Sequence, residues 1–335
     1  WVKTNLGGYP YGYWCGGSPA GSLMDRLDYD NDTATAVTKG PLSSAKGYNT
    51  ATGNASYGYF GGGESLISTV DRIDYSSDTG TAPSKGPLNV GRHEMGATGS
   101  TSFGYFGGGV NPAPSRRTTI DRIDYSNDTA TAATKGPLTY ATRDLAAVSG
   151  QEFGLPSSPT GDRIRGTFVT SPSSTTAYGY IAGGDPTTTY IDRIDFGNDT
   201  AQASPKGNLT QQRYNYNQSV GSRTYGYVMG GYTPSVPEPN GNLSSIDRIN
   251  YSNDTATAPS VANLNASPGI YAAATTSNND YAYLAGGGQH PGPTFSTIRR
   301  FDYSSDTSNT VDKSTLSGSK NFITGTGNLS FGYFG

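Results

Sequence analysis

Residues 104–109, Gly-Tyr-Phe-Gly-Gly-Gly, belong to a phrase that recurs along the whole chain. Its central tyrosine recurs at Tyr13, Tyr59, Tyr105, Tyr180, Tyr227, Tyr283 and Tyr333. The spacings between successive tyrosines are 46, 46, 75, 47, 56 and 50 residues. A period of about 45 to 50 residues that holds several strand-length pieces is typical of a β-propeller and not of a helical array. Repeated residues then build the scaffold, so functional residues are expected among those that do not repeat.

The unit from Gly86 to Leu138 shows how one repeat divides into strands. It predicts four strands, at residues 93–98, 103–106, 119–125 and 129–135. Glycines 107–109 mark a point where the backbone adopts positive φ or passes close to a neighbour. Residues 126–129, Ser-Asn-Asp-Thr, have the chemistry of a tight turn, because Asn and Asp side chains bond their own backbone. We therefore expect an all-β fold with four-stranded antiparallel blades.

The blade count follows from the number of Gly-Tyr phrases. Seven phrases predict seven blades, with the last one completed beyond Gly335, and six blades is the alternative. We expect one propeller domain over residues 1–335, as part of a longer chain. The widest gap, between Tyr105 and Tyr180, holds extra residues at 150–169. We interpret them as a long loop after a fourth strand, the alternative being a decayed blade.

Composition excludes several classes of protein. Hydrophobic residues make up only 33 % of the chain, while Gly (47) and Tyr (25) are abundant, which disfavours helices and suits strands. A net charge of −3 provides no basic field for nucleic acid. Cys15 is the single cysteine, so no intrachain disulfide is possible, and no apolar run predicts a membrane span.

The order of motifs resembles the kelch repeat over nearly the whole chain. The shared features are a glycine doublet after an aromatic strand, a strand ending in Asp-Tyr, a Thr after a tight turn, and Pro-Leu followed by a cation. One departure is that Thr131-Ala132 stands in the fourth strand, where the kelch family usually has a Trp. The near-identical Asp-Arg-Ile-Asp-Tyr-Ser-Asn-Asp-Thr pattern is also similar to kelch-like structural proteins of marine cyanobacterial phages. That resemblance implies a component of the virion surface, such as a tail fibre or spike.

Loop lengths distinguish the two faces of such a propeller. Turns between the third and fourth strands barely vary in length. Connections between the second and third strands vary widely, at Val110–Arg117, Asp185–Thr189, Tyr232–Leu243 and Gln289–Ser296. They share a face with the connections from one blade to the next, and we name this the variable face. Because ligand-binding residues concentrate on loops carried by a rigid scaffold, it is the candidate binding face.

Basic residues also recur on the variable face. A cation follows each Pro-Leu-like phrase, except in the sixth unit, where Pro268 stands: Lys46, Arg92, Arg143, Arg213 and Lys320. Radial symmetry predicts a partial ring that would focus an anion such as an acidic glycan. The alternative, which we favour, is that these cations bond loop carbonyls as part of the scaffold. Further candidate ligand-binding residues lie in the variable loops: Arg116, Arg117, Tyr232, His290 and Phe295.

The remaining motifs favour scaffold roles over chemistry. The Asp-Arg pairs, such as Asp121 and Arg122, occur too regularly to form one site, and adjacent strand residues point to opposite faces. We expect each to bond the neighbouring blade. The alternation at Asp28, Asp30 and Asp32 is that of a calcium loop, but a downstream Glu is missing, which favours an ordinary turn. We predict no catalytic residues, no metal site and no cofactor, because two histidines cannot supply a multi-His cage.

These patterns lead to one functional expectation with two alternatives. We expect a non-catalytic propeller on a virion or other extracellular assembly, oligomeric through that assembly. It would bind a host surface glycan or receptor protein through the variable face. The first alternative is a purely architectural part that joins other subunits. An intracellular kelch adaptor is the second, and nothing in the chain resembles its partner modules.

Overall fold

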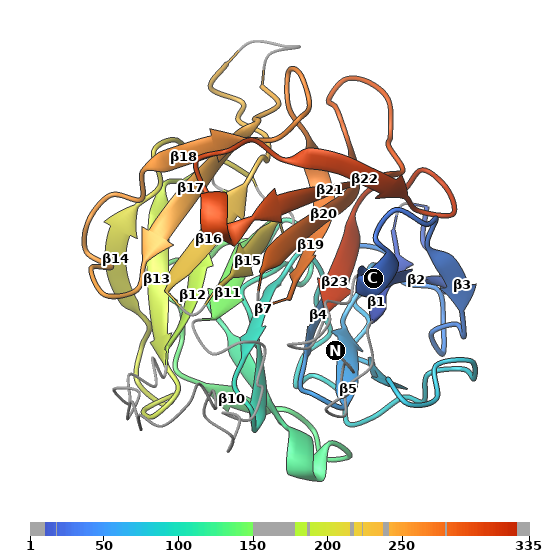
Figure 1. The fold of residues 1–335 in the computed structure, drawn as a ribbon. Coiled ribbons are helices and arrows are strands. Elements are labelled where there is room, and N and C mark those ends of the chain that lie inside the picture. Colours follow the sequence, from blue (N-terminus) through green and yellow to red (C-terminus); the bar gives the residue numbers. More distant parts are fainter. Residues whose placement is uncertain are drawn as a thin grey trace, which may run out of the picture.

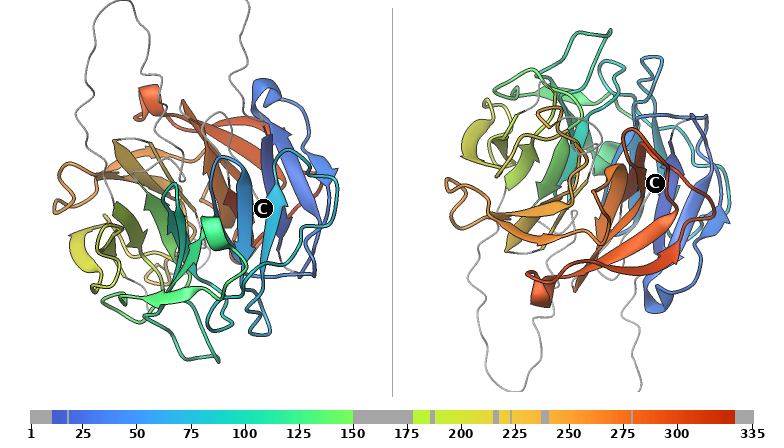
Figure 2. Two further views of the ribbon diagram at one scale, coloured as in Figure 1. Left: turned by 90° about the horizontal axis from the view of Figure 1, so that it is seen from below. Right: turned by 90° about the horizontal axis from the view of Figure 1, so that it is seen from above.

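The computed structural model describes residues 11–149 and 178–326, apart from short gaps at 18, 186–187, 215–217, 223, 237–240 and 279. Over these residues the chain is an all-β propeller of six blades, each an antiparallel sheet (Figures 1 and 2). The six innermost strands, β23, β4, β7, β11, β15 and β19, contact one another in that order around the centre. None of the described helices is long and apolar enough to span a membrane.

Each blade extends from an innermost strand at the centre of the ring to an outermost strand at its edge. In that order, blade 1 contains β23 (Ile323–Thr326), β1 (Tyr11–Gly16), β2 (Met24–Asp28) and β3 (Val37–Lys39). Blade 2 contains β4 (Thr50–Gly53), β5 (Tyr57–Gly61) and β6 (Val70–Asp74), with an isolated bridge from Asp71 to Ser84 in place of a fourth strand. Blade 3 contains β7 (Gly96–Gly99), β8 (Phe103–Gly107), β9 (Ile120–Asp124) and β10 (Ala133–Lys135).

The other three blades repeat this order. Blade 4 contains β11 (Ala146–Ser149), β12 (Tyr178–Ala182), β13 (Tyr190–Asp195) and β14 (Ser204–Asn208). Blade 5 contains β15 (Ser219–Gly221), β16 (Tyr225–Met229), β17 (Ser245–Asn250) and β18 (Ser260–Asn263). Blade 6 contains β19 (Tyr271–Ser277), β20 (Tyr281–Gly288), β21 (Thr297–Asp302) and β22 (Val311–Thr315). Short 3-10 helices follow three of the third strands: η1 (Tyr29–Asn31), η2 (Tyr125–Asn127) and η4 (Tyr303–Ser305).

Blade 1 closes the ring by pairing the two ends of the described chain. The C-terminal strand β23 is hydrogen-bonded to β1, with Thr326 opposite Tyr13 and Thr324 opposite Cys15 (Figure 1). β23 therefore completes the first blade and does not begin a seventh one. The blade count is six, the lower of the two that the sequence allowed, and the preferred count of seven is corrected. The seventh phrase, at Tyr333, lies outside the described residues.

The predicted insertion at 150–169 also lies outside the described residues, but the strands that flank it are described. β11 precedes it and β12 follows it, and these two strands are paired neighbours in blade 4. β11 is an innermost strand, which corrects the expectation that the segment follows a fourth strand. Residues 150–177 instead connect the first and second strands of one blade.

The glycine doublet after each second strand meets both requirements that the sequence indicated. Gly62 and Gly63 have φ of 71° and 142°, and the first of them allows close approach to the next blade. A Cβ atom on Gly62 would lie 2.3 Å from the carbonyl oxygen of Arg92. The N–H of Gly63 donates to that same carbonyl at 3.0 Å. Glycine is required at this position because any side chain would separate the blades.

A carboxylate from each tight turn joins neighbouring blades. Asp199, in the turn after β13, accepts hydrogen bonds from Tyr105 (2.9 Å) and Arg122 (2.7 Å) of blade 3. Lys135 lies 3.2 Å from its other oxygen. The same position accepts from the Tyr and Arg of the preceding blade at all six boundaries, and we name the six residues the inter-blade carboxylates: Asp32, Asp78, Asp128, Asp199, Asp254 and Asp306. The arginine of each Asp-Arg pair therefore bonds the neighbouring blade, as expected.

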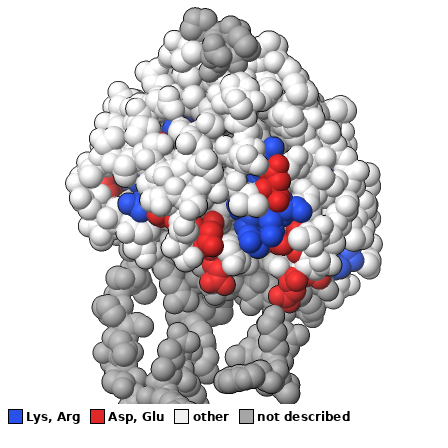
Figure 3. Space-filling view, turned by 45° about the horizontal axis from the view of Figure 1, so that its top comes forward, with Lys and Arg blue, Asp and Glu red and all other residues white. Residues whose placement is uncertain are grey.

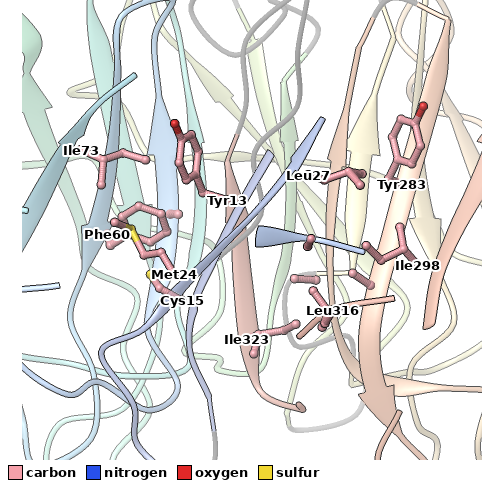
Figure 4. Close-up of a cluster of buried hydrophobic side chains, with 14 of the residues drawn as sticks. Tyr13, Cys15, Met24, Leu27, Phe60, Ile73, Tyr283, Ile298, Leu316 and Ile323 are labelled. Carbon is pink, nitrogen blue, oxygen red and sulfur yellow. The ribbon is translucent and has the colours of Figure 1, made fainter. Parts of the chain in front are cut away.

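Apolar side chains fill the rest of the space between blades. Figure 4 shows both sides of blade 1, with Met24 near Phe60 of blade 2 and Leu27 on the side of Tyr283 of blade 6. Cys15 is fully buried in this cluster, where burial raises the pKa of its thiol well above the ordinary value. It packs as a small apolar side chain.

The inter-blade carboxylates predict a large stability effect. Asp128→Ala removes the acceptor of Tyr59, Arg72 and Lys85, which leaves the buried Tyr59 hydroxyl and two half-buried cations without this partner. We expect a loss on the order of 3 kcal/mol in the free energy of unfolding, measured by chemical denaturation. The control Asp124→Ala removes only a local cap and should cost about 1 kcal/mol. Equal losses in the two variants would contradict the role assigned to Asp128.

Candidate functional site

Most of the predicted ring of cations is buried inside the blades. Lys46, Arg92 and Arg213 are exposed by 0, 1 and 0 %. Each pairs with the aspartate of an Asp-Arg phrase, at 3.7 Å to Asp71, 3.1 Å to Asp121 and 3.0 Å to Asp247, respectively. Burial therefore removes these three residues from any ligand surface and corrects the idea of an anion-focusing ring. The scaffold alternative describes their placement.

Lys320 and Arg143 are more accessible but are also paired. Lys320 lies 2.7 Å from Asp25, in the same arrangement as the buried cations. Arg143 does not belong to that set. The N–H of Gly109 donates to Thr142, whereas the N–H of Gly63 donates to Arg92, so Thr142 is the structural counterpart of Arg92. The sequence alignment of the repeats was one residue out of register at Arg143.

Arg143 instead organises a cluster of charges on the variable face. Its guanidinium donates to Asp185 at 2.7 Å and to Glu94 at 3.0 Å, and it lies 3.6 Å from Asp144. Arg116 reaches the same oxygen of Asp185 at 2.7 Å. We name Glu94, Arg116, Arg143, Asp144 and Asp185 the charged cluster. Its two arginines are both occupied by carboxylates, so they do not offer a free cationic site.

Two carboxyl groups of the charged cluster have opposite pKa shifts. Burial, together with the charge of Glu94, raises the pKa of Asp144 well above its ordinary value. Burial would also raise the pKa of Asp185, but hydrogen bonds from Arg116 and Arg143 outweigh it and lower that pKa. One oxygen of Asp144 is buried without a hydrogen-bond partner among the described residues.

Aromatic side chains continue around the same face. Ring centroids lie 6.1 Å apart for Tyr214 and Tyr232, 5.3 Å for Tyr232 and His290, and 6.1 Å for His290 and Tyr271. The series continues from Tyr271 to Phe322 at 5.7 Å and from Phe322 to Tyr48 at 4.4 Å. We name these six residues the aromatic arc. His93 follows Tyr48 at 6.3 Å and lies 3.9 Å from Glu94, which links the aromatic arc to the charged cluster.

Backbone geometry fixes where these side chains project. Tyr48, Glu94, Asp144, Ala272 and Phe322 all have φ between 53° and 59°, at the same place near the start of the innermost strand. The N–H of Glu94 donates to the carbonyl of Tyr48, and the N–H of Asp144 donates to that of Glu94. Since this left-handed backbone recurs in five blades, it belongs to the scaffold, which presents a different side chain from each blade.

Four of the candidate residues named from the sequence lie on this surface. Tyr232 and His290 lie in the aromatic arc, and Arg116 and Arg143 lie in the charged cluster. Arg117 donates to the carbonyl oxygen of Asn111 within its own loop. Phe295 packs against the core between blades 5 and 6, with Arg299 5.9 Å above its ring. Four members of the aromatic arc were not anticipated, although each lies one or two residues after the repeated cation position or its counterpart: Tyr48, Tyr214, Tyr271 and Phe322.

Charges are sparse on the side of the molecule that Figure 3 shows. There, Lys, Arg, Asp and Glu gather in a few small mixed groups separated by uncharged surface. Within the described residues, no group of three or more His, Cys, Asp or Glu side chains is arranged to hold a metal ion. On the variable face, the aromatic arc offers rings for stacking and the charged cluster offers carboxylate oxygens for hydrogen bonding.

The closed ring of six blades defines the chain as a β-propeller. No protein-family model matches it, and no curated protein is similar to it in sequence. Among solved structures, the one titled "Structure of YjhT" is similar, with a TM-score of 0.62 and 9 % sequence identity, over 85 % of this chain and 88 % of that chain. At this level of identity the likeness supports the propeller fold alone.

The opposite pKa shifts of Asp144 and Asp185 predict opposite mutational effects. Because the folded-state pKa of Asp144 is raised, its ionisation destabilises the fold as pH rises above the unfolded value of about 3.9. Asp144→Asn should therefore raise the melting temperature at pH 7.5 and change it little at pH 3.5. Asn also tolerates the positive φ at this position.

Asp185→Asn is the matched control. The lowered pKa of Asp185 means that its charged form stabilises the fold above the unfolded pKa, and that this stability is lost as pH falls. This variant should lower the melting temperature at pH 7.5. A loss of stability in Asp144→Asn as large as in Asp185→Asn at pH 7.5 would refute the assignment.

Proposed function

We propose that this chain is a non-catalytic, kelch-like propeller that recognises a host surface carbohydrate through its variable face, as part of a virion or other extracellular assembly. The observation that carries the proposal is the aromatic arc. Its tyrosines and Phe322 are half-buried and His290 is exposed, so their rings pack on the protein and remain partly accessible. Aromatic faces of this kind stack on the C–H faces of sugar rings, and a few polar groups beside them supply orientation.

The charges of the variable face favour a neutral saccharide over an acidic one. Arg116 and Arg143 are bonded to Asp185, and Arg117 is bonded to a backbone carbonyl. An acidic sugar would have to displace these bonds, whereas hydroxyl groups can add to the remaining lone pairs of Glu94 and Asp185. This revises the expectation of an acidic glycan that the cation ring suggested.

The kelch and virion parts of the proposal rest on sequence pattern. The glycine doublet, the Asp-Tyr strand end and the Pro-Leu phrase occupy the kelch order, and the repeated Asp-Arg-Ile-Asp-Tyr pattern is similar to structural proteins of marine phages. A displayed propeller with one customised face suits host attachment.

An architectural role is the second candidate, and the same observation supports it. Aromatic residues are enriched at protein interfaces, so the aromatic arc also suits the surface of another subunit. The two candidates differ in whether the purified propeller binds a sugar by itself.

Removal of one ring from the aromatic arc tests the carbohydrate proposal. Tyr271→Ala and Tyr48→Ala should each weaken binding to the glycan that the wild-type protein selects on an array by roughly tenfold, since each ring contributes one stacking contact. Phe103→Ala, which removes a half-buried ring on the opposite side of blade 3, should leave binding unchanged. Binding should change little between low and physiological salt.

Two outcomes would contradict the proposal. If the folded wild-type propeller binds no glycan at either salt concentration, the architectural candidate replaces the carbohydrate candidate. If it binds only acidic glycans, and salt abolishes the binding, the ligand is an anion and not a neutral saccharide.

A further inference from the structure

The blades differ at one buried ion pair. The third strand carries a buried aspartate in five blades: Asp25, Asp71, Asp121, Asp192 and Asp247. In four of these five blades a cation pairs with it: Lys320, Lys46, Arg92 and Arg213, for blades 1, 2, 3 and 5. In blade 6 both members are exchanged, because Arg299 replaces the aspartate and Ile270 takes the cation position. Blade 4 alone keeps the aspartate, Asp192, and has lost the cation, since Thr142 occupies that position.

Asp192 is left with neutral partners. It is 7 % exposed and accepts hydrogen bonds from the backbone N–H (2.9 Å) and the hydroxyl (2.5 Å) of Thr139. No Lys, Arg or His bridges it among the residues that the structure describes. Burial raises the pKa of its carboxyl group. Burying a carboxylate without a cation nearby lowers the stability of the fold. In blades 1, 2, 3 and 5 a cation beside the equivalent aspartate offsets this loss.

The missing cation leaves a pocket. A pocket with a volume of about 70 Å³ lies in blade 4 next to Asp192 and Thr142. Its walls are the apolar side chains of Leu138, Leu145 and Ile181. Tyr140 and Tyr190 also line it, stacked on each other at 4.6 Å and exposed by 50 and 48 %. The pocket lies at the variable-face end of blade 4, because its lining residues between 138 and 142, together with Gly183 and Thr188, come from the loops of that face.

Blade 2 shows how an ammonium group fits such a position. Nζ of Lys46 donates to the carbonyl of Thr69 at 2.9 Å and lies 3.7 Å from Asp71. Tyr190 is the counterpart of Thr69, because Gly183 donates to its carbonyl as Gly62 donates to that of Thr69. Lys46 also donates to the hydroxyl of Thr69 at 2.7 Å. Tyr190 has no such hydroxyl beside its backbone, so blade 4 keeps two of the three acceptors, the carboxylate and the carbonyl, without the lysine.

We propose that the blade 4 pocket binds a primary ammonium group on a short apolar stem, the chemistry of a lysine side chain. The ammonium group pairs with Asp192 and the carbonyl of Tyr190, and the stem packs on Leu138, Leu145 and Ile181 between the exposed tyrosines. The ligand supplies from outside the cation that blades 1, 2, 3 and 5 carry in their own sequence. This site is separate from the aromatic arc and does not depend on the carbohydrate proposal.

The test is a titration of the ¹⁵N-labelled protein with n-butylamine, followed by NMR at neutral pH. Saturable shifts of the amides of Thr142, Gly183 and Tyr190 are expected, and n-butanol, which lacks the charge, should bind at least tenfold more weakly. Asp192→Asn should also weaken butylamine binding at least tenfold. Absence of saturation, or equal binding of butanol, would overturn the proposal.

Restoring the cation provides an independent readout. Thr142→Lys should fill the pocket, abolish butylamine binding and raise the melting temperature by several degrees. In the background of Asp192→Asn the same substitution should give no such gain. Butylamine binding that persists in a folded Thr142→Lys variant would overturn the proposal. If Thr142→Lys does not fold, the butylamine titration of Asp192→Asn still tests it.

The source of the ammonium group is distinguished by a second titration. Nα-acetyl-lysine methylamide is compared with its Nε-acetylated form, which is neutral. Binding at least tenfold tighter than that of butylamine indicates a lysine of a partner protein, and binding no tighter indicates a free alkylamine. Equal binding of the two lysine derivatives would overturn the ammonium proposal.

Discussion

The hydrogen bonds to one carboxylate at each blade boundary, buried at five of the six, are the interaction on which the rest of the structure depends. At every boundary, a tyrosine from the second strand and an arginine from the third strand of one blade donate to the Asp of the Asp-Thr turn in the next blade. The series closes on itself, because Tyr283 and Arg300 of blade 6 donate to Asp32 of blade 1. A chain with only 33 % hydrophobic residues has a limited apolar core to distribute over six interfaces. Charge-assisted bonds in buried positions supply the specificity that apolar packing alone does not.

The sequence predicted the parts of this scaffold that repeat. The propeller class, the order of the strands, the special glycines and the interaction of each arginine with the neighbouring blade all follow from local pattern. The blade count does not, because the inner-strand pattern at 323–326 is equally suited to begin a seventh blade or to complete the first. The sequence also could not predict the burial of Lys46, Arg92 and Arg213. A long basic side chain after Pro-Leu can point either into a blade or out to solvent. The shift of one residue at Arg143 became visible only through the hydrogen bond of Gly109 to Thr142.

Candidate functional features arise where the repeat is broken. The left-handed residue near the start of each innermost strand has a constant backbone, but its side chain changes from Tyr48 to Glu94 to Asp144, which places aromatic groups on one part of the variable face and charges on another. The exchange of a buried cation for Thr142 turns an internal ion pair into a pocket. Scaffold and site are thus separated within each repeat: the carboxylates and glycines hold the ring, and the residues beside them vary.

The ring closes through blades 6 and 1 by the same contact that joins the other blades. A double-mutant cycle on Arg300 and Asp32, which are 268 residues apart in sequence, measures this contact directly. Arg300→Ala, Asp32→Ala and the double variant are compared by chemical denaturation, with Arg72 and Asp128 as the reference pair within the ring. We predict a coupling energy of about 1 to 3 kcal/mol for both pairs. A coupling energy near zero for Arg300 and Asp32, with a normal value for Arg72 and Asp128, would contradict closure of the six-bladed ring.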